Sequence, residues 1–419
     1  MKLNICMLLY LRYHPDMTVY PQIEIASYVR NYGHRVTWII WEEGSRHVNF
    51  YVFNGIQIYT TPYVKYIPSD SRVATFLNLI PNTIRRIHLV FKILKEEKYD
   101  LISVVDYAFD GLVPYYMKKR YKTPLIFQLQ NPLEQYLHPL EKYLPGRGRE
   151  ITIATLISYF PAKLHEYIGK MLLHKVDLVL PISKWLEAHL VEQGIPESKI
   201  MSCPSGVDIR SFSNVRKLDA HNEYDLDNWR KIVYVGSLDK LRHLELLIQA
   251  FSEVLVKKRN VKLLIIGEGN DGPNLKQCAN RLNIKEQIIF TGQIPRREIP
   301  DLITVADICV SPIQPLSFYK LSSPIKVLEY MAMAKPVVAN QEIYEQNEIL
   351  TESGGGILVP FDPHAFASSI LELLDNPEKA SYMGQKGREW VVKNRDYEIL
   401  ARKVEERYLK LLNGATRNV

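Results

Sequence analysis

Short apolar runs alternate with amphipathic stretches along most of the chain. The first run, Leu3–Leu9, is followed by a stretch with helical spacing, Pro21–Tyr32, and then by a second run, Arg35–Ile40. Apolar runs without polar alternation are typical of parallel strands that are covered on both faces. The order strand, helix, strand therefore predicts a doubly wound α/β domain at the start of the chain.

The same order continues through the first 200 residues. Apolar runs predict three further strands, at Leu101–Val105, Leu125–Leu129 and Asp177–Pro181. Asn54 and Gly55 accept positive φ angles, so they predict the turn of a hairpin within residues 49–61. Thr83–Lys95 has apolar residues at helical spacing with basic residues between them, which predicts a basic amphipathic helix.

A second α/β unit is predicted in the remainder of the chain. Residues 209–230 are polar and lack periodicity, as expected of a linker, and Lys231–Val235 then begins a new series of buried strands. With 419 residues, the chain is long enough for two domains with separate cores.

Charge changes this picture because it is unevenly distributed. The formal net charge is +7; residues 1–200 contain 24 Lys and Arg against 18 Asp and Glu, whereas residues 201–419 contain 29 against 28. The basic excess of the first half indicates an anionic partner, such as a membrane surface or a phosphate-bearing acceptor, or else an ordinary solvated face. It is too diffuse for a nucleic-acid-binding stripe, so no nucleic-acid partner is expected.

The cysteines and the apolar runs favour a cytoplasmic protein. Four cysteines are scattered without CxxC or Cys/His spacing, which indicates neither a zinc site nor a disulfide framework and suits a reducing compartment. No apolar run reaches the roughly 20 residues that span a bilayer. Residues 3–11 lack a cleavage site and are better explained as a strand than as a signal peptide. We expect a soluble protein, or a peripheral one on the inner face of the plasma membrane.

Candidate chemistry is concentrated in residues 306–340, which are predicted to form strand, loop, helix and strand. The helix is expected to be capped by Ser322 and Ser323. Helix N-termini bind anions through free amides and the helix dipole. Lys326 and Glu329 lie three residues apart, one turn in, so both can face one ligand. This pattern fits a diphosphate site, although an ordinary capped helix shares it.

A glycine turn after the first strand of the second unit offers another phosphate contact. Gly236 and Ser237 follow that strand, and a glycine there lets backbone amides approach phosphate oxygens. The neutralising cation must come from Lys240 or Arg242. We favour Arg242, because a guanidinium can bind two phosphate oxygens at once.

A second glycine turn, Gly267-Glu268-Gly269, begins a GxGxxG pattern. By itself this is weak evidence for a dinucleotide-binding fold, and the acidic residue expected after the next strand, Ile288–Phe290, is missing. A nicotinamide-dependent oxidoreductase is therefore the least favoured interpretation. We expect this turn to contact the nucleotide part of a donor.

Two runs of sequence resemble the donor site of a known family. PIKVLEYMA at residues 324–332 and KPVV at residues 335–338 resemble the signature of the retaining glycosyltransferases of family four, the glycosyl transferases group 1. That family usually has two Glu separated by seven residues; the first contacts the transferred sugar and the second the nucleotide ribose. Glu329 matches the second, whereas Leu321 occupies the place of the first.

The resemblance extends along most of the chain and implies the GT-B fold, an α/β architecture of two doubly wound parallel-sheet domains facing a cleft. CPSGVD at residues 203–208 is similar to the family's Pro-Asn-Gly-Val-Asp and marks the crossing between domains. The implied division is an acceptor-side domain at 1–208, a linker at 209–230, a nucleotide-sugar-binding domain at 231–385, and C-terminal helices at 386–419 that cross back to the first domain.

The resemblance also implies a reaction. A hexose or related sugar would move from a nucleoside diphosphate donor to a glycan or lipid-linked acceptor, with retention and without a metal or a bound cofactor, in cell-surface polysaccharide or glycolipid synthesis. Arg242, Lys326 and the amides near Ser322 and Ser323 would hold the diphosphate and stabilise the charge that develops on it.

The acceptor is expected at the first domain, because ligands bind at the carboxyl ends of parallel strands. Arg12 and His14 follow the first strand, and Gln130 and Asn131 follow Leu125–Leu129. In relatives the place of Gln130 is often a histidine that faces the reacting sugar, and a glutamine cannot act as an acid or a base.

Several interpretations stay open. The helix Thr83–Lys95 either lies on a membrane surface or packs its apolar side on the sheet, and residues 132–175, which interleave aromatic and basic residues, form either a lid or groove for an amphipathic acceptor or a packed helix pair. Besides a transferase, the same architecture could serve a nucleotide-sugar epimerase or a catalytically inactive binding protein.

Overall fold

The chain folds into two compact α/β units. The computed structural model describes residues 1–13, 21–65, 72–136, 153–213, 224 and 226–416. One unit comprises Met1–Pro204 together with Ala401–Val419, and the other comprises Ser205–Leu400. The predicted α/β class is therefore confirmed in both halves of the chain.

The first unit contains a seven-stranded sheet in the order β3-β4-β2-β1-β5-β6-β7. Its strands are β1 (Asn4–Arg12), β2 (Arg35–Glu43), β3 (Asn49–Phe53), β4 (Ile56–Tyr63), β5 (Leu101–Val105), β6 (Leu125–Leu129) and β7 (Leu178–Pro181). All pairings are parallel except β3 with β4, which form the predicted hairpin at Asn54 (φ 49°) and Gly55 (φ 76°). This sheet is thus parallel with one antiparallel edge strand.

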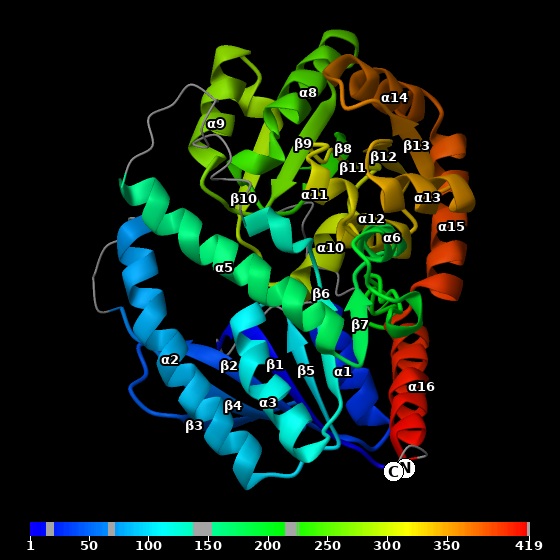
Figure 1. Cartoon of the computed structure of the whole chain (residues 1–419). Helices are drawn as coiled ribbons and strands as arrows, with labels where there is room; N and C mark the ends of the chain where they lie inside the picture. Colours follow the sequence, from blue (N-terminus) through cyan, green and yellow to red (C-terminus); the bar gives the residue numbers. More distant parts are fainter. Residues whose placement is uncertain (14–20, 66–71, 137–152, 214–223, 225, 417–419) are drawn as a thin grey trace. The chain divides into compact units, whose positions relative to one another are not determined.

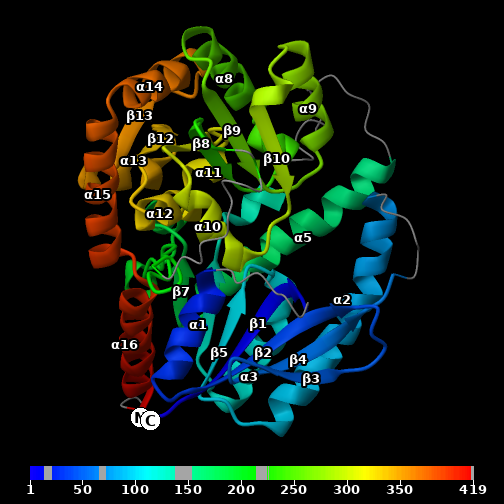
Figure 2. The same ribbon diagram turned by 180° about the vertical axis from the view of Figure 1, so that it is seen from behind.

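Helices cover both faces of this sheet (Figures 1 and 2). They are α1 (Pro21–Asn31), α2 (Arg72–Glu96), α3 (Leu112–Tyr121), α5 (Ile153–Lys175), α6 (Lys184–Glu192) and the C-terminal part of α16 (Tyr397–Thr416). On β6, Gln128 faces α1 and α16, whereas Phe127 faces the opposite side, near Leu172 of α5. Ser183 caps α6 as predicted, with its Oγ accepting the Leu186 amide at 3.0 Å.

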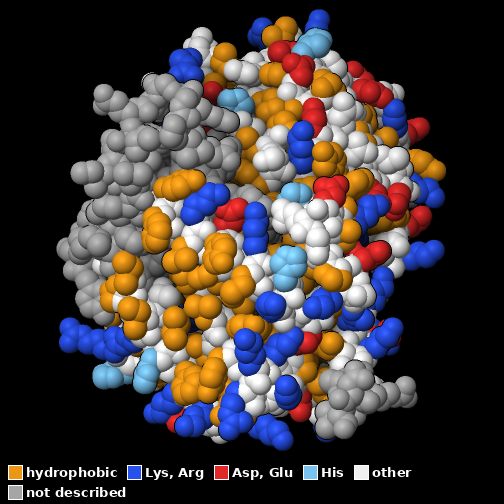
Figure 3. All heavy atoms as spheres, viewed as in Figure 1, with side chains coloured by type: hydrophobic (Ala, Val, Ile, Leu, Met, Phe, Trp, Pro, Cys, Tyr) orange, Lys and Arg blue, Asp and Glu red, His pale blue; other side chains and the backbone are white. Residues whose placement is uncertain are grey.

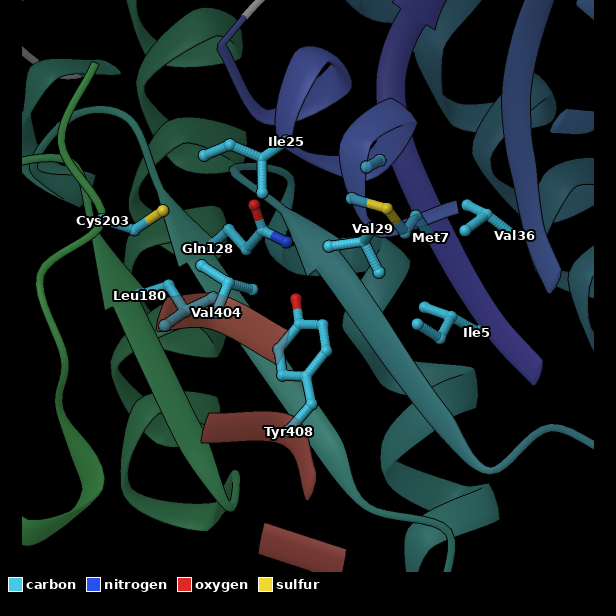
Figure 4. A pocket seen from close by; sticks show the side chains of 11 residues that line it. Ile5, Met7, Ile25, Val29, Val36, Gln128, Leu180, Cys203, Val404 and Tyr408 are labelled. Atoms are coloured by element: carbon cyan, nitrogen blue, oxygen red, sulfur yellow. The ribbon is translucent and has the colours of Figure 1, made fainter. Parts of the chain in front are cut away.

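A small pocket lies between the sheet, α1 and α16 (Figure 4). Apolar side chains line most of it, and its polar groups include Gln128, whose amide donates to Ser103 Oγ at 2.8 Å, and the hydroxyl of Tyr408. Its volume of about 10 Å³ admits roughly one water molecule. The pocket is therefore a packing feature under α16 and not a substrate site.

The second unit contains a six-stranded, fully parallel sheet in the order β10-β9-β8-β11-β12-β13. Its strands are β8 (Arg230–Val235), β9 (Val261–Ile266), β10 (Ile288–Gly292), β11 (Ile308–Ser311), β12 (Val337–Asn340) and β13 (Gly356–Val359). Buried side chains alternate between its faces; Tyr234 of β8 enters one core and Val233 the other. This double coverage explains the unbroken apolar runs in the sequence.

Two groups of helices form these cores. One face packs against α8 (Glu245–Lys257), α9 (Gly272–Arg281) and α14 (Pro363–Asp375). The other packs against α10 (Ile299–Thr304), α12 (Ile325–Ala332), α13 (Tyr344–Ser353) and α15 (Pro377–Asn394). A short helix, α11 (Ser317–Lys320), lies in the loop before α12.

The described part of the predicted linker 209–230 is grouped with the second unit, Ser205–Leu400. Phe212 and Leu226 are 4% and 0% exposed and lie in the same core as Val207. A polar, aperiodic stretch can still contribute isolated anchors, which periodicity does not reveal. Residues 214–223 and 225 lie outside the described residues.

The C-terminal segment also divides differently from the predicted boundary at 386. Helix α15 packs in the second unit, and the chain is counted with the first unit only from Ala401. There Glu405 of α16 lies close to His34, with 2.7 Å between Oε1 and Nε2. The last helix is thus shared between the units, and α15 is not part of the returning segment.

Candidate functional site

Two glycine turns of the second unit lie side by side at the carboxyl ends of β8 and β9. The Gly236 amide donates to the Ile266 carbonyl at 2.9 Å, and the Leu238 amide donates to the Glu268 carbonyl at 3.0 Å. A Cβ at Gly267 would lie 2.0 Å from the Gly236 carbonyl oxygen, so only glycine fits there. Gly267 and Gly269 therefore hold one turn against the other.

The ammonium of Lys326 lies against Gly236. Its Nζ donates to Tyr234 Oη at 3.1 Å and sits 4.2 Å from the centroid of that ring. A Cβ at Gly236, whose φ is 151°, would come within 2.9 Å of the same Nζ. Lys326 is therefore held at the strand edge, directly over a glycine backbone.

Tyr234 contacts this lysine through its ring and its hydroxyl. The sequence did not indicate this role. Its ring is fully buried, its hydroxyl accepts from Lys326, and it donates to the Ser237 carbonyl at 3.3 Å. Burial raises the pKa of the Tyr234 hydroxyl above its usual value, which keeps it a neutral donor. In the sequence it looks like one more apolar strand residue.

Arg242 is the second cation of this edge. It ends a short 3-10 turn, Lys240–Arg242, and its guanidinium stacks on Tyr319 of α11 at 4.7 Å from the ring centroid. Burial lowers the pKa of Lys326 well below its usual value; the charge of Arg242 lowers it further, and Glu329 opposes both. The two cations therefore share one electrostatic environment.

The start of α12 differs from the prediction. Pro324 occupies the N-cap position, and no side chain caps the helix. The Ser322 hydroxyl donates to the Tyr319 carbonyl at 2.7 Å, whereas Ser323 Oγ accepts the Ser205 amide at 3.0 Å. Because no side chain caps α12, its N-terminus retains the property that favours an anion.

Glu329 lies one turn into α12 and is 3% exposed. Its Oε1 is 2.6 Å from Nη2 of Arg296, which lies in the turn Arg296–Glu298 after β10. Arg296 was not among the predicted residues, because nothing in the local sequence links it to a residue 33 positions away. The edge thus combines two cations, an uncapped helix and a buried carboxylate.

Two family models together account for most of the chain. "Glycosyltransferase Family 4" matches residues 23–211, and "Glycosyl transferases group 1" matches residues 218–390. The chain belongs to the family-four glycosyltransferases. Its resemblance to that family, inferred from the runs at 324–332 and 335–338, is thereby confirmed.

The curated relatives of this glycosyltransferase include enzymes named for different sugar products and transferred groups. The alpha-monoglucosyldiacylglycerol synthase of Streptococcus pneumoniae is 23% identical over 372 residues, which cover 85% of this chain and 76% of the relative. The alpha-D-kanosaminyltransferase of Streptomyces kanamyceticus is 27% identical over 174 residues, 41% of this chain and 44% of the relative. The match to the latter therefore spans less than half of that protein.

Solved structures confirm the GT-B fold. Sucrose-phosphate synthase of Thermosynechococcus elongatus superposes with a TM-score of 0.75 at 18% identity and covers 99% of this chain and 100% of its own. The Anabaena protein HepE in complex with UDP and glucose gives a TM-score of 0.68 at 15% identity, with coverages of 97% and 99%.

The remaining donor-side candidates of this glycosyltransferase make fewer side-chain contacts at this edge. Lys240 and Glu268 are exposed, and Ser237 contributes its carbonyl to Tyr234. Leu321, at the place of the family's first Glu, ends α11. The assignments of these residues to a donor stay predictions.

At the first unit, the structure describes only part of the predicted acceptor side. His14 and the side chain of Arg12 lie outside the described residues. The backbone amide of Gln130 donates to Asp106 Oδ1 at 2.7 Å. The side-chain Nε2 of Gln130 is buried without a hydrogen-bond partner among the described residues. Asn131 is half-buried.

Asp106 is the residue that the sequence analysis passed over here. It follows β5 with a φ of 57°, and burial raises the pKa of its carboxyl to about 7, against the Gln130 hydrogen bond that lowers it. Its place at a strand end was visible in the sequence, but its burial was not. Within the described residues, no cluster of three His, Cys, Asp or Glu is placed to hold a metal ion.

Proposed function

We propose that this chain is a retaining, metal-independent glycosyltransferase that moves a sugar from a nucleoside diphosphate donor to a glycan or lipid-linked acceptor. The observation that carries the proposal is the position of Lys326 against Gly236, within the electrostatic influence of Arg242. Burial and the charge of Arg242 both lower the pKa of Lys326, so an anion of more than one charge is needed to keep this lysine protonated beside the guanidinium. A diphosphate meets that requirement.

The donor edge would act on the leaving group. The bond between the anomeric carbon and the diphosphate oxygen breaks, a bond from the acceptor oxygen to that carbon forms, and the acceptor proton passes to the departing phosphate. Lys326, Arg242 and the amides of α12 stabilise the negative charge left on the diphosphate. Removing one such donor from an enzyme typically costs about 3–4 kcal/mol of transition-state stabilisation.

Relatives support both substrates. HepE was solved with UDP-glucose as well as with UDP, and a mycobacterial relative, 26% identical over 224 residues, is named as GDP-mannose-dependent. The pneumococcal relative is named for a glucosylated diacylglycerol. A UDP or GDP sugar and a lipid-linked acceptor are therefore the first combinations to test, with cell-surface glycolipid or polysaccharide as the product.

An acceptor-dependence assay tests this function. Each nucleotide sugar is incubated with the protein, with and without a bacterial lipid extract, and products are followed by NMR. A retaining transferase forms an α-linked product from an α-linked donor only when the extract is present. An epimerase would convert the nucleotide sugar without the extract, and a catalytically inactive protein would not convert it with or without the extract. Either result would refute the proposal.

We further propose peripheral association with the inner face of the plasma membrane, through α5. Phe160, Leu164 and Tyr167 lie at i, i+4 and i+7 on one side of this helix and are 69%, 39% and 71% exposed. Figure 3 shows hydrophobic side chains gathered on this face of the first unit. Such a stripe suits an interfacial helix.

Charge on α5 favours an anionic surface. Lys163 and Lys170 flank the stripe and share Glu166, at 2.8 and 2.7 Å from its carboxylate oxygens, and Lys175 is exposed at the helix end. Three cations thus accompany one carboxylate. Each cation near an anionic leaflet contributes about 1 kcal/mol.

The structure argues against α2 as the membrane helix. Val90, Ile93 and Leu94 are buried, and Arg86 is 1% exposed, with its Nε 2.7 Å from Asp110 Oδ1. The buried apolar side of α2 therefore packs on the sheet, as the competing interpretation predicted, whereas Ile80 and Ile84 are 44% and 64% exposed. No helix within the described ranges is long and apolar enough to cross a membrane.

A further inference from the structure

We infer that Arg296 positions the carboxylate of Glu329, the residue to which the family resemblance assigns the donor ribose, and that Arg296 is thereby a determinant of nucleoside binding. The inference rests on the proposed function, because it takes the donor to be a nucleoside diphosphate sugar. Arg296 lies in a turn after β10, and Glu329 lies in α12, so the fold brings the pair together within the second unit.

The contact is specific to one of two adjacent arginines. Arg296 reaches the 3% exposed Glu329, with 2.6 Å between Nη2 and Oε1. Its neighbour Arg297 is 75% exposed and lies 3.4 Å from Glu298, the next residue. An arginine that is placed merely for solubility resembles Arg297, not Arg296.

The pair is close but not aligned as a hydrogen bond. Oε1 of Glu329 is buried and lacks a well-directed donor among the described residues, although Nη2 of Arg296 is only 2.6 Å away. A buried ion pair with imperfect geometry contributes little to folding stability, because an apolar pair of the same size often stabilises the fold equally well. Its placement is better explained by a ligand that completes it.

The chemistry of a ribose fits this acceptor. A carboxylate only accepts hydrogen bonds, and the adjacent hydroxyls of a ribose both donate. Lys326, three residues before Glu329 on the same helix face, would hold the phosphates of the same nucleotide. Arg296 would hold the Glu329 carboxylate in the orientation that the ribose hydroxyls require while Lys326 binds the phosphates. It would not contact the reacting atoms.

A ligand and variant cycle tests the inference by calorimetry. The wild type is titrated with UDP and GDP, and the one that binds more tightly is then compared with its 2′,3′-dideoxy counterpart in Arg296→Gln, Glu329→Gln, Arg296→Lys and the matched control Arg297→Gln. We expect Arg296→Gln and Glu329→Gln to weaken the ribonucleotide about tenfold and to leave the dideoxynucleotide within twofold of wild type. Arg296→Lys should recover part of the loss, and Arg297→Gln should change neither affinity.

Retained dideoxynucleotide binding also shows that each variant is folded. Equal weakening of both ligands by Arg296→Gln would mean that Arg296 acts on the base or the phosphates, and no weakening would mean that it has no role in binding. Either result would overturn the inference and leave the proposed function standing. If the wild type bound neither UDP nor GDP, the proposed function would fall and this inference with it.

Discussion

The carboxyl edges of the two sheets offer opposite chemistry on the same architecture. In the second unit, Lys326 of α12, a helix without a side-chain cap, lies against Gly236, and burial and the charge of Arg242 lower the pKa of this lysine. In the first unit, the corresponding edge presents Asp106, whose carboxyl pKa is raised to about 7 by burial, and Gln130, whose buried Nε2 has no partner among the described residues. One edge therefore carries cationic side chains, whereas the other carries an amide and a carboxyl whose ionisation burial disfavours.

The difference shows how one fold can sort two substrates. Parallel sheets bring ligand-binding loops to their carboxyl ends in both units, so topology alone fixes where substrates bind. Under the proposed function, the side chains on those loops select the ligand, a diphosphate at the edge of the second unit and a hydroxyl-bearing acceptor at the edge of the first. Changes at each edge should therefore have separable effects on donor and acceptor.

The largest separable effect is expected for Lys326→Ala. Because the ammonium is held against Gly236 by Tyr234, its loss removes a charge placed where the leaving group develops its own. We expect kcat to fall by about 10²–10³, measured as donor consumption in the presence of acceptor. Lys257→Ala, at an exposed lysine near the end of α8, is the control and should leave kcat unchanged. A fall of less than threefold for Lys326→Ala would remove this residue from the donor site.

Arg242→Ala should have a smaller effect on the same edge. A hydrogen bond to a charged group typically contributes about 1.5–3 kcal/mol, so the affinity for the nucleoside diphosphate should fall about 10- to 100-fold. Arg242→Lys should recover only part of this, because a lysine lacks the planar fork that stacks on Tyr319. Full recovery by lysine would mean that charge alone matters at this position.

On the first unit, the double variant Phe160→Ser/Tyr167→Ser should weaken membrane binding about tenfold, because two largely exposed apolar side chains no longer enter the interface. Flotation with phosphatidylglycerol-containing vesicles at low salt measures this. Tyr382→Ser, at a tyrosine that is 62% exposed on α15, is the matched control. If the double variant floated as well as the wild type, α5 would not be the docking helix. If the wild type itself failed to float, the membrane proposal would be wrong.

The smallest effect is expected for Asp106→Asn, and it is measured as the pH dependence of the melting temperature. The folded-state pKa of about 7 lies above the usual 3.8, so the folded protein holds the proton more tightly and this carboxyl destabilises it as pH rises between those values. The variant has no carboxyl to ionise, so its melting temperature relative to wild type should rise by a few degrees from pH 4 to pH 7. Asparagine also tolerates the φ of 57°.

The control for that comparison is Asp375→Asn, whose native carboxylate is 59% exposed and paired with Lys258. Its melting temperature relative to wild type should not increase over the same pH range. A parallel increase in both variants would show that general charge, and not the burial of Asp106, sets the trend.

The sequence predicted the layered fold well and the site only in part. Strands such as β5 and β6 match their predicted bounds, because a doubly covered strand leaves an apolar run that no other element explains. Lys326 and Gly236 could be named as candidates from the sequence, because strand-end glycines and helix N-termini are local patterns. Their contact with each other was not predicted.

The misses share one physical cause, which is contact between distant segments. Ser323 was expected to cap α12 but instead bonds Ser205, 118 residues away. Arg86 is one of the basic residues of the amphipathic helix predicted at residues 83–95, but it is buried against Asp110. Tyr234 looks like an apolar strand residue until its hydroxyl is seen beside Lys326. Local periodicity carries no information on such pairs.

Calorimetric titration of the wild-type protein with UDP and GDP, with uridine and guanosine as references, tests most directly whether the edge of the second unit binds a nucleoside diphosphate. The account predicts that at least one diphosphate binds and that its nucleoside binds at least tenfold more weakly, because Lys326 and Arg242 act on the phosphates. No measurable binding of either diphosphate, or equal affinity for a diphosphate and its nucleoside, would contradict it.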